Sequence, residues 1–296
     1  MDTPTTRGAR SRATPGVGAW IGAHPLAAYL LIAYALSWAC WVPLALGVRT
    51  VEPGVGWPSQ LPGLTGPAIS ALIVTALVGG KAGLVDLWLR VTRWRVGWWW
   101  LSVVVLVVAG AIAVATAGDF AAGDVTLFNG ISSSIGPLLT IVLVFVLNGL
   151  GEEVGWRGFL ADHLLQRHGL TATALLVALA WAPWHAPIFF LVASLRGLAV
   201  PELVGWALGL TAGSFVLTWL YRGSGSSILL VAVWHTVFNF TSGATPAGSG
   251  LVAAVTSTLV MAAAVAIVVV ESRRGRRRTP AGARRARAAG RAEPQP

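Results

Sequence analysis

Charged residues are scarce in this sequence of 296 residues. Only 11% are Asp, Glu, Lys or Arg, whereas 55% are hydrophobic. A soluble domain carries about 25% charged residues, so this chain has too little polar surface to face water on all sides. Cysteine is nearly absent as well. Cys40 is alone, which excludes an intramolecular disulfide framework, and it lies in an apolar segment, where a thiol is normally inert.

Acidic residues are few, 11 against 21 basic ones, which gives a formal net charge of +10. A basic chain can bind nucleic acid, but nine of its basic residues lie between Arg273 and Arg291, directly after the last apolar segment. Lys and Arg at such a place fix membrane orientation and attract anionic headgroups. We therefore expect membrane lipid as a partner and no nucleic acid.

Long apolar segments of about 20 residues, the length that crosses a bilayer, recur along the chain. They predict an all-α membrane protein, a polytopic bundle of about eight transmembrane helices. The expected spans are 23–46, 61–79, 98–117, 136–155, 170–192, 203–221, 227–240 and 251–270. The seventh is short for a full crossing, so the sequence leaves open whether it spans.

The positions of the basic residues predict the orientation. With both termini in the cytoplasm, 19 of the 21 lie on the inside and only Arg49 and Arg196 outside, as the positive-inside rule requires for an even number of crossings. We expect a multi-pass protein of the cell membrane with three parts. These are a cytoplasmic tail (1–22), a membrane domain (23–270, with its motifs in 136–240) and a basic, disordered cytoplasmic tail (271–296).

Residues 81–96 follow the second expected span and have a helical pattern of their own. Leu84, Leu87 and Val91 recur on one side, while Asp86 and Arg90 occupy the opposite side. This pattern predicts an amphipathic helix that lies in the cytoplasmic interface of the membrane.

Two adjacent carboxylates, Glu152 and Glu153, stand at the end of the fourth span, although ionisable groups are costly in a membrane. Arg157 follows Glu153 by four residues, the spacing at which helical side chains meet, so we expect these two to pair. Glu152 points about 100° away and stays free of that pair, as a general base must. Gly151 and Gly155 have the spacing of a close helix contact.

Further polar groups lie in two later spans. His185 stands between Pro183 and Pro187, which disturb the helix, and His235 and Asn239 are four residues apart and share a face. A single such group is often only a hydrogen bond between helices. Three spans that together supply carboxylate, imidazole and amide groups favour an active site.

Several known peptidase chemistries lack their residues here. There is no H-E-x-x-H motif of a zinc peptidase helix and no G-x-S-x-G context for a serine nucleophile. An intramembrane aspartyl enzyme needs two buried Asp, but Asp119 and Asp124 lie in a loop. The carboxylate, imidazole and amide groups of these spans remain as the candidate catalytic groups.

The motifs in these spans resemble those of the CPBP family, the CAAX prenyl endopeptidases and bacteriocin-processing or immunity proteins also called Abi. The family pattern E-E-x-x-x-R is Glu152-Glu153-Val-Gly-Trp-Arg157 here, and H-x-x-x-N is His235-Thr-Val-Phe-Asn239. The third motif, F-x-x-x-H, has Trp181 in place of Phe. The resemblance covers about residues 80–240.

The resemblance implies a role for each of these residues. Glu152 and His185 would hold and activate a water molecule, His235 and Asn239 would stabilise the oxyanion, and Glu153 and Arg157 would support the site. The reaction would need no metal. Zinc remains the less favoured alternative, with Glu152, His185 and His235 as ligands.

We therefore predict an intramembrane endopeptidase of the glutamic type that cleaves a membrane-associated peptide or protein. The alternative is a non-catalytic protein, a bacteriocin-immunity factor or a membrane chaperone, that uses the same polar core for binding. A solute transporter would show repeat symmetry, which is not evident. Neither the substrate, its prenylation nor the oligomeric state follows from the sequence.

Overall fold

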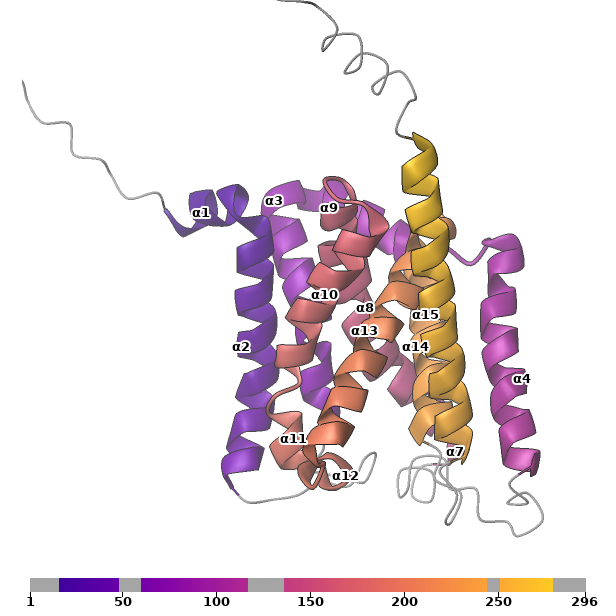
Figure 1. Ribbon diagram of the computed structural model, residues 1–296. Coiled ribbons are helices and arrows are strands. Elements are labelled where there is room, and N and C mark those ends of the chain that lie inside the picture. The colour runs from indigo at the N-terminus through magenta and orange to yellow at the C-terminus, as the bar shows by residue number, and fades with distance from the viewer. Residues whose placement is uncertain (1–15, 48–59, 117–135, 244–250, 279–296) are drawn as a thin grey trace, which may run out of the picture.

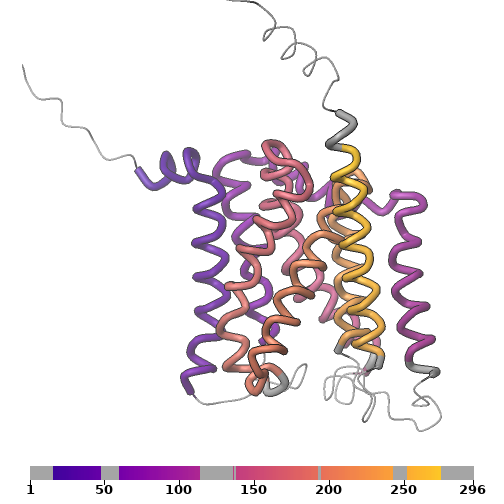
Figure 2. The backbone as a smooth tube through the Cα atoms, in the orientation of Figure 1, coloured from indigo at the N-terminus to yellow at the C-terminus, as the bar shows by residue number. Residues whose placement is uncertain are grey.

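The protein is an all-α bundle (Figures 1 and 2). The structure, a computed structural model, describes residues 16–47, 60–116, 136–243 and 251–278. The expected loop residues Arg49, Asp119 and Asp124 lie outside the described residues, as do most residues of both expected tails.

The helices follow one another along the chain, and several are interrupted by short 3-10 or π-helical segments, labelled η. In order they are α1 (Val17–Ala23), α2 (Pro25–Leu46), η1 (Leu61–Thr65), α3 (Gly66–Val91), η2 (Gly97–Trp100), α4 (Leu101–Thr116), α7 (Pro137–Val144), η3 (Phe145–Leu150), α8 (Gly151–Gly155), η4 (Trp156–Ala161), α9 (Asp162–Leu165), α10 (Leu170–Trp184), α11 (Ile188–Leu191), α12 (Ala193–Arg196), α13 (Val200–Gly223), α14 (Ile228–Gly243) and α15 (Leu251–Arg278).

The expected spans are present as helices. Within the described residues, six helices are long and apolar enough to cross a membrane, and two shorter apolar ones, 97–113 and 228–242, coincide with the third and seventh expected spans. The predicted polytopic, all-α class is confirmed. α14 has 16 residues and is about 24 Å long, shorter than a hydrocarbon core of about 30 Å. The described chain begins and ends at the same end of the bundle (Figure 1), as an even number of crossings requires.

The fourth span is longer than predicted. We expected it to end at residue 155, but the helix continues through η4 and α9 to Leu165, and all residues from 151 to 161 are buried. Arg157, which we counted in a cytoplasmic segment, therefore lies inside the bundle. The reason is packing: a side chain at Gly151 would come within 2.9 Å of the Leu64 carbonyl oxygen, and one at Gly155 within 2.6 Å of the backbone of Pro67. The close contact predicted for these two glycines is confirmed.

The amphipathic segment is the second half of α3. The helix bends at Gly80, where φ is 57° and ψ is −151°, values that favour glycine. Leu87 is buried as expected, and Arg90 Nη2 lies 2.9 Å from Asp86 Oδ2, so these two residues share a side of the helix as predicted, but the Arg90 side chain is not directed to solvent. Its guanidinium is only 12% exposed and donates to the Gly158 carbonyl at 2.8 Å and the Tyr221 hydroxyl at 2.7 Å. The long side chain turns inward because these acceptors lie inside the bundle.

α15 extends beyond the expected span. It continues to Arg278, so residues 271–278 of the expected tail are helical, and the residues after them are outside the described part.

Candidate functional site

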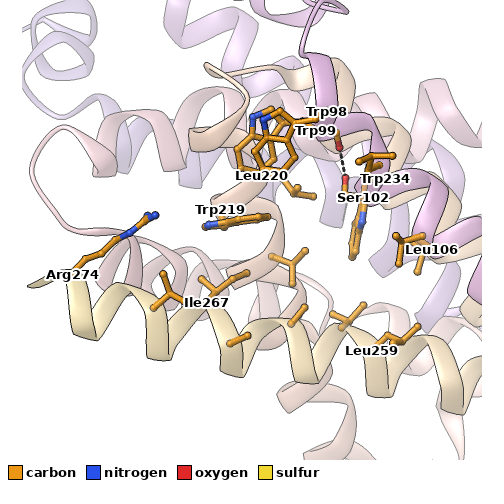
Figure 3. A pocket seen from close by; sticks show the side chains of 17 residues that line it. Trp98, Trp99, Ser102, Leu106, Trp219, Leu220, Trp234, Leu259, Ile267 and Arg274 are labelled. Carbon is orange, nitrogen blue, oxygen red and sulfur yellow. Dashed lines mark hydrogen bonds between the residues drawn. The ribbon is translucent and has the colours of Figure 1, made fainter.

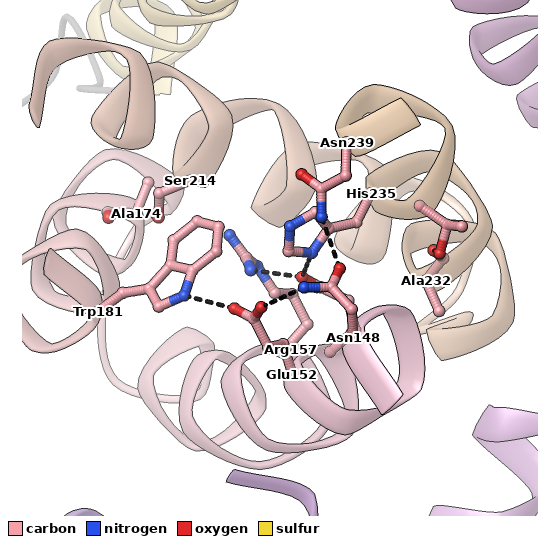
Figure 4. A network of polar contacts seen from close by, with 11 residues as sticks. Asn148, Glu152, Arg157, Ala174, Trp181, Ser214, Ala232, His235 and Asn239 are labelled. Carbon is pink, nitrogen blue, oxygen red and sulfur yellow. Dashed lines mark hydrogen bonds and ion pairs between the residues drawn. The ribbon is translucent and has the colours of Figure 1, made fainter. Parts of the chain in front are cut away.

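Three parts of the bundle bring the predicted polar residues together. α8 and η4 carry the two glutamates and Arg157, the end of α10 carries Trp181 and leads to His185, and α14 carries His235 and Asn239. Figure 4 shows side chains from these elements, among them Trp181, Arg157 and His235, meeting around Glu152 and its neighbours. The cluster lies in the interior, because Glu152, Glu153, Arg157 and His235 are all buried.

Glu153 is neutralised by cationic and imidazole partners. Its Oε1 accepts from Arg157 Nη1 at 2.7 Å and from His235 Nδ1 at 2.7 Å. The ion pair predicted from the four-residue spacing is confirmed. Both carboxylate and guanidinium are fully buried, so each is the main compensation for the charge of the other. The bond to His235 fixes the orientation of that ring.

Glu152 has different surroundings. Its Oε1 accepts from Asn148 Nδ2 at 3.0 Å, and its Oε2 from Trp181 Nε1 at 2.7 Å. Both donors are neutral, and in the part of the chain that the structure describes Glu152 makes no ion pair. Since a carboxylate can accept about four hydrogen bonds, it keeps the capacity to bind water.

Arg157 is stacked on Trp181, with its guanidinium carbon 4.4 Å from the centre of the indole ring. Its Nε and Nη2, together with the Oε2 of Glu153 and the hydroxyl of Tyr29, have no hydrogen-bond partner among the described residues. Buried polar groups of this kind are normally satisfied by ordered water. The cluster is therefore suited to hold internal water beside the two glutamates.

His185 lies where α10 ends. The helix stops at Trp184 and α11 begins only after Pro187, so the predicted disturbance by the prolines is confirmed. His185 Nδ1 lies 2.8 Å from the Trp181 carbonyl oxygen. Because a carbonyl oxygen only accepts, Nδ1 carries the proton, and Nε2 of the neutral ring is free to accept.

A cavity of about 520 Å³ joins these residues. Trp181, His185, His235 and Asn239 line it, together with Trp206 of α13. Glu152 is 2% exposed and is not part of the cavity lining. It is hydrogen-bonded to the indole of Trp181, which does line the cavity. Trp181 also contacts both imidazoles, with ring centres 5.8 Å from His185 and 5.5 Å from His235. It is therefore the side chain that connects Glu152 to the histidines.

The arrangement does not fit a zinc site. Among the described residues, no three side chains of His, Cys, Asp or Glu are grouped closely enough to hold a metal ion. Both oxygens of Glu152, a member of the alternative ligand set, accept hydrogen bonds from N–H donors.

Two hydrogen-bond donors of this site were not predicted from the sequence. Asn148 donates to Glu152 and accepts from Asn239 Nδ2 at 2.5 Å, so it joins α14 to the carboxylate. Its place four residues before Glu152, in an apolar span, was a usable signal. The indole N–H of Trp181 was missed because the residue was compared with Phe only as an aromatic ring.

The same segment of the chain matches known proteins. Residues 134–241 match a family described as type II CAAX prenyl endopeptidase Rce1-like. A curated relative, CAAX prenyl protease 2 of Methanococcus maripaludis, is 25% identical over 116 residues, which make up 38% of this chain and 43% of the relative. The chain thus matches less than half the length of that relative. The matched range contains the following residues of the site: Asn148, Glu152, Glu153, Arg157, Trp181, His185, His235 and Asn239.

Proposed function

We propose that this chain is a member of the CPBP family and an intramembrane endopeptidase that hydrolyses a peptide bond in a membrane-associated substrate. The proposal rests on one observation: two adjacent carboxylates have different hydrogen-bond partners. Glu153 is paired with Arg157, whereas Glu152 is buried with neutral donors only, next to a cavity lined by two histidines and an asparagine. A purely structural pair of glutamates gives no reason for this difference.

The attacking water would be held between the Glu152 carboxylate and His185 Nε2. Glu152 takes a proton from it as the water oxygen attacks the carbonyl carbon of the substrate. The protonated Glu152 then gives this proton to the leaving amine when the C–N bond breaks. The products are a carboxylic acid and an amine, and no metal ion is required in this scheme.

The oxyanion of the tetrahedral intermediate needs hydrogen-bond donors. Asn239 has two amide hydrogens, one of which is used by Asn148, so the other is available. His235 donates its Nδ1–H to Glu153, and therefore donates to the oxyanion only when Nε2 is protonated too. The bond to Glu153 on the other side of the ring holds Nε2 in a fixed direction. Arg157 pairs with Glu153 and so holds in place the acceptor of the His235 Nδ1–H.

We place the protein in the cell membrane with both termini in the cytoplasm. The support is the distribution of Lys and Arg in the sequence. In that orientation the cavity, lined by Gly205 near the start of α13 and Ser242 near the end of α14, lies in the half of the bundle away from the cytoplasm.

The proposal is tested with Glu152→Gln, which keeps the size of the side chain but removes the base. We expect cleavage to fall by about 10²–10⁴-fold, the usual effect of losing a general base. The measurement is proteomics of new protein termini in membranes that contain the wild type or the variant. Glu202→Gln is the matched control, because Glu202 is exposed at the start of α13 and is not among the residues that line the cavity.

Equal sets of termini from the wild type and Glu152→Gln would exclude the peptidase and favour a non-catalytic binding protein. Because the relative is named CAAX prenyl protease 2, the first purified substrate to try is a prenylated CAAX peptide. Failure to cleave it, with termini still dependent on Glu152, would leave the peptidase and change only its substrate.

A further inference from the structure

A second, apolar groove lies between α4, α13, α14 and α15 (Figure 3). Its volume is about 500 Å³. The only charged side chain that lines it is that of Arg274, and its one hydroxyl, on Ser102, is already bonded to the Trp99 carbonyl at 2.7 Å. Apart from the indole N–H groups of its four tryptophans, the groove therefore offers little to water along its length.

The groove faces the surroundings of the bundle. Leu101 and Val105 on α4 and Val270 on α15, which line it, are 58%, 59% and 43% exposed. In a membrane-spanning bundle these side chains meet hydrocarbon rather than water, so an apolar chain is the occupant that such a groove selects.

Its length fits one lipid of one leaflet. Along α15 the lining runs from Arg274 to Leu259, a distance of about 22 Å at 1.5 Å per residue. A bilayer with its headgroups is about 40–45 Å thick, so half of it is about the same length. In Figure 3 Arg274 lies at one end of the groove and Leu259 toward the other, with Trp98 and Trp99 above it.

The charge at the Arg274 end selects an anion. Arg274 Nη1 lies 3.1 Å from Glu271 Oε1, and the same oxygen accepts from Arg222 Nη2 at 2.7 Å. Two guanidinium groups thus share one carboxylate, which leaves a net positive charge. Arg274 is 64% exposed and has further N–H groups to donate, and guanidinium binds phosphate well.

We propose that this groove binds one anionic phospholipid, with an acyl chain along α15 and its phosphate at Arg274. The bound chain also packs against the candidate site. Trp234 lines both the groove and the cavity that contains the neighbouring His235, so lipid and substrate would contact opposite sides of one indole. The lipid site itself does not depend on the proposed peptidase activity.

Two pairs of substitutions test the binding of the acyl chain and the binding of the phosphate separately. Ala263→Trp fills the groove, whereas Ala262→Trp, its control, adds the same bulk at an exposed neighbour outside the lining. Arg274→Gln removes the cation at the groove, and Arg273→Gln removes the same charge from an exposed neighbour that is not part of the lining.

The measurement is native mass spectrometry of the full chain after exchange into phosphatidylglycerol or phosphatidylcholine with identical acyl chains. We expect the wild type to retain one phosphatidylglycerol, Ala263→Trp to lose it, and Arg274→Gln to weaken it by about tenfold toward the level of phosphatidylcholine. Both controls should resemble the wild type.

Equal retention of the two lipids by the wild type would overturn the proposal. So would equal losses within either matched pair, which indicate general adhesion to an apolar or basic surface. Should Ala263→Trp fail to fold, as circular dichroism would show, the arginine pair alone decides.

Discussion

At the scale of single residues, the chain gives two adjacent carboxylates opposite surroundings. Glu152 and Glu153 project about 100° apart on their helix, so each meets a different neighbouring helix. Glu153 meets Arg157 and the imidazole of His235, and Glu152 meets Asn148 and the indole of Trp181. The contrast between an ion-paired and a neutral environment is what assigns them different chemistry.

Trp181→Phe tests the indole N–H without removing the ring. The loss of a hydrogen bond to a charged group should reduce the free energy of unfolding by about 1.5–3 kcal/mol. Without the indole N–H, the ring at position 181 no longer binds the Glu152 carboxylate. The carboxylate can then reach the cavity more easily, so Glu152 should also react faster with a carbodiimide. Both effects are measured on purified protein, by thermal unfolding and by mass spectrometry of the labelled residue.

Trp98→Phe is the control, since Trp98 is 63% exposed and lies outside the cluster. Unchanged labelling of Glu152 in Trp181→Phe would show that the indole does not shield the carboxylate.

Arg157→Met removes the cation that Glu153 depends on. It leaves a fully buried carboxylate with only His235 beside it, so the free energy of unfolding should fall by about 3–5 kcal/mol. Thermal unfolding in detergent measures the change. Adding Glu153→Gln should recover part of the loss, because the uncompensated charge is then gone. A double variant as unstable as the sum of both single variants would contradict this account.

At the scale of elements, α8 is positioned by a close contact with the start of α3. It is flanked by the π-helical η3 and η4, segments that often occur at functional sites because their wider turns redirect side chains. Gly151 and Gly155 let the backbones approach, which places the carboxylates in the interior rather than at the surface.

Gly155→Ala should disturb that contact. The added methyl group would lie 2.6 Å from the Pro67 backbone, which cannot yield as a flexible side chain does, so we expect a loss of about 1–3 kcal/mol in stability. Gly79→Ala in α3 is the control, because a methyl group there meets nothing within 4 Å. Comparable melting temperatures for the two variants would rule out the contact as the constraint.

At the scale of the whole molecule, Arg90 connects parts that are distant in sequence. It binds the Gly158 carbonyl in η4 and the Tyr221 hydroxyl in α13, and Tyr221 in turn donates to Asp162 at 2.8 Å. The second half of α3 is thereby fastened to the helix that carries both glutamates.

Arg90→Met should loosen this connection while keeping most of the side chain's apolar length. We expect faster amide hydrogen exchange in residues 81–91 and 156–165 and little change in α15, because only the former are joined by Arg90. Arg95→Met is the control, since the Arg95 guanidinium is stacked only on the neighbouring Trp94 ring, 5.0 Å from its centre. Uniform exchange changes in both variants would exclude a specific role for Arg90.

What the sequence determined alone is the local part of this protein. Apolar length identified the spans, and the four-residue spacing was enough for the Glu153–Arg157 pair, because helix geometry makes such side chains neighbours wherever the helix lies. The same rule would have found the contact between Asn148 and Glu152.

Only the tertiary structure decided the partners that come from other helices. Trp181 binds Glu152 across 29 residues, His235 binds Glu153 across 82, and Arg90 binds the Gly158 carbonyl across 68. Periodicity fixes the direction of a side chain on its helix, whereas the rotation and depth of each helix depend on packing with its neighbours. In this bundle that packing is set by contacts such as Gly155 on Pro67, whose partner the helix's own pattern does not reveal.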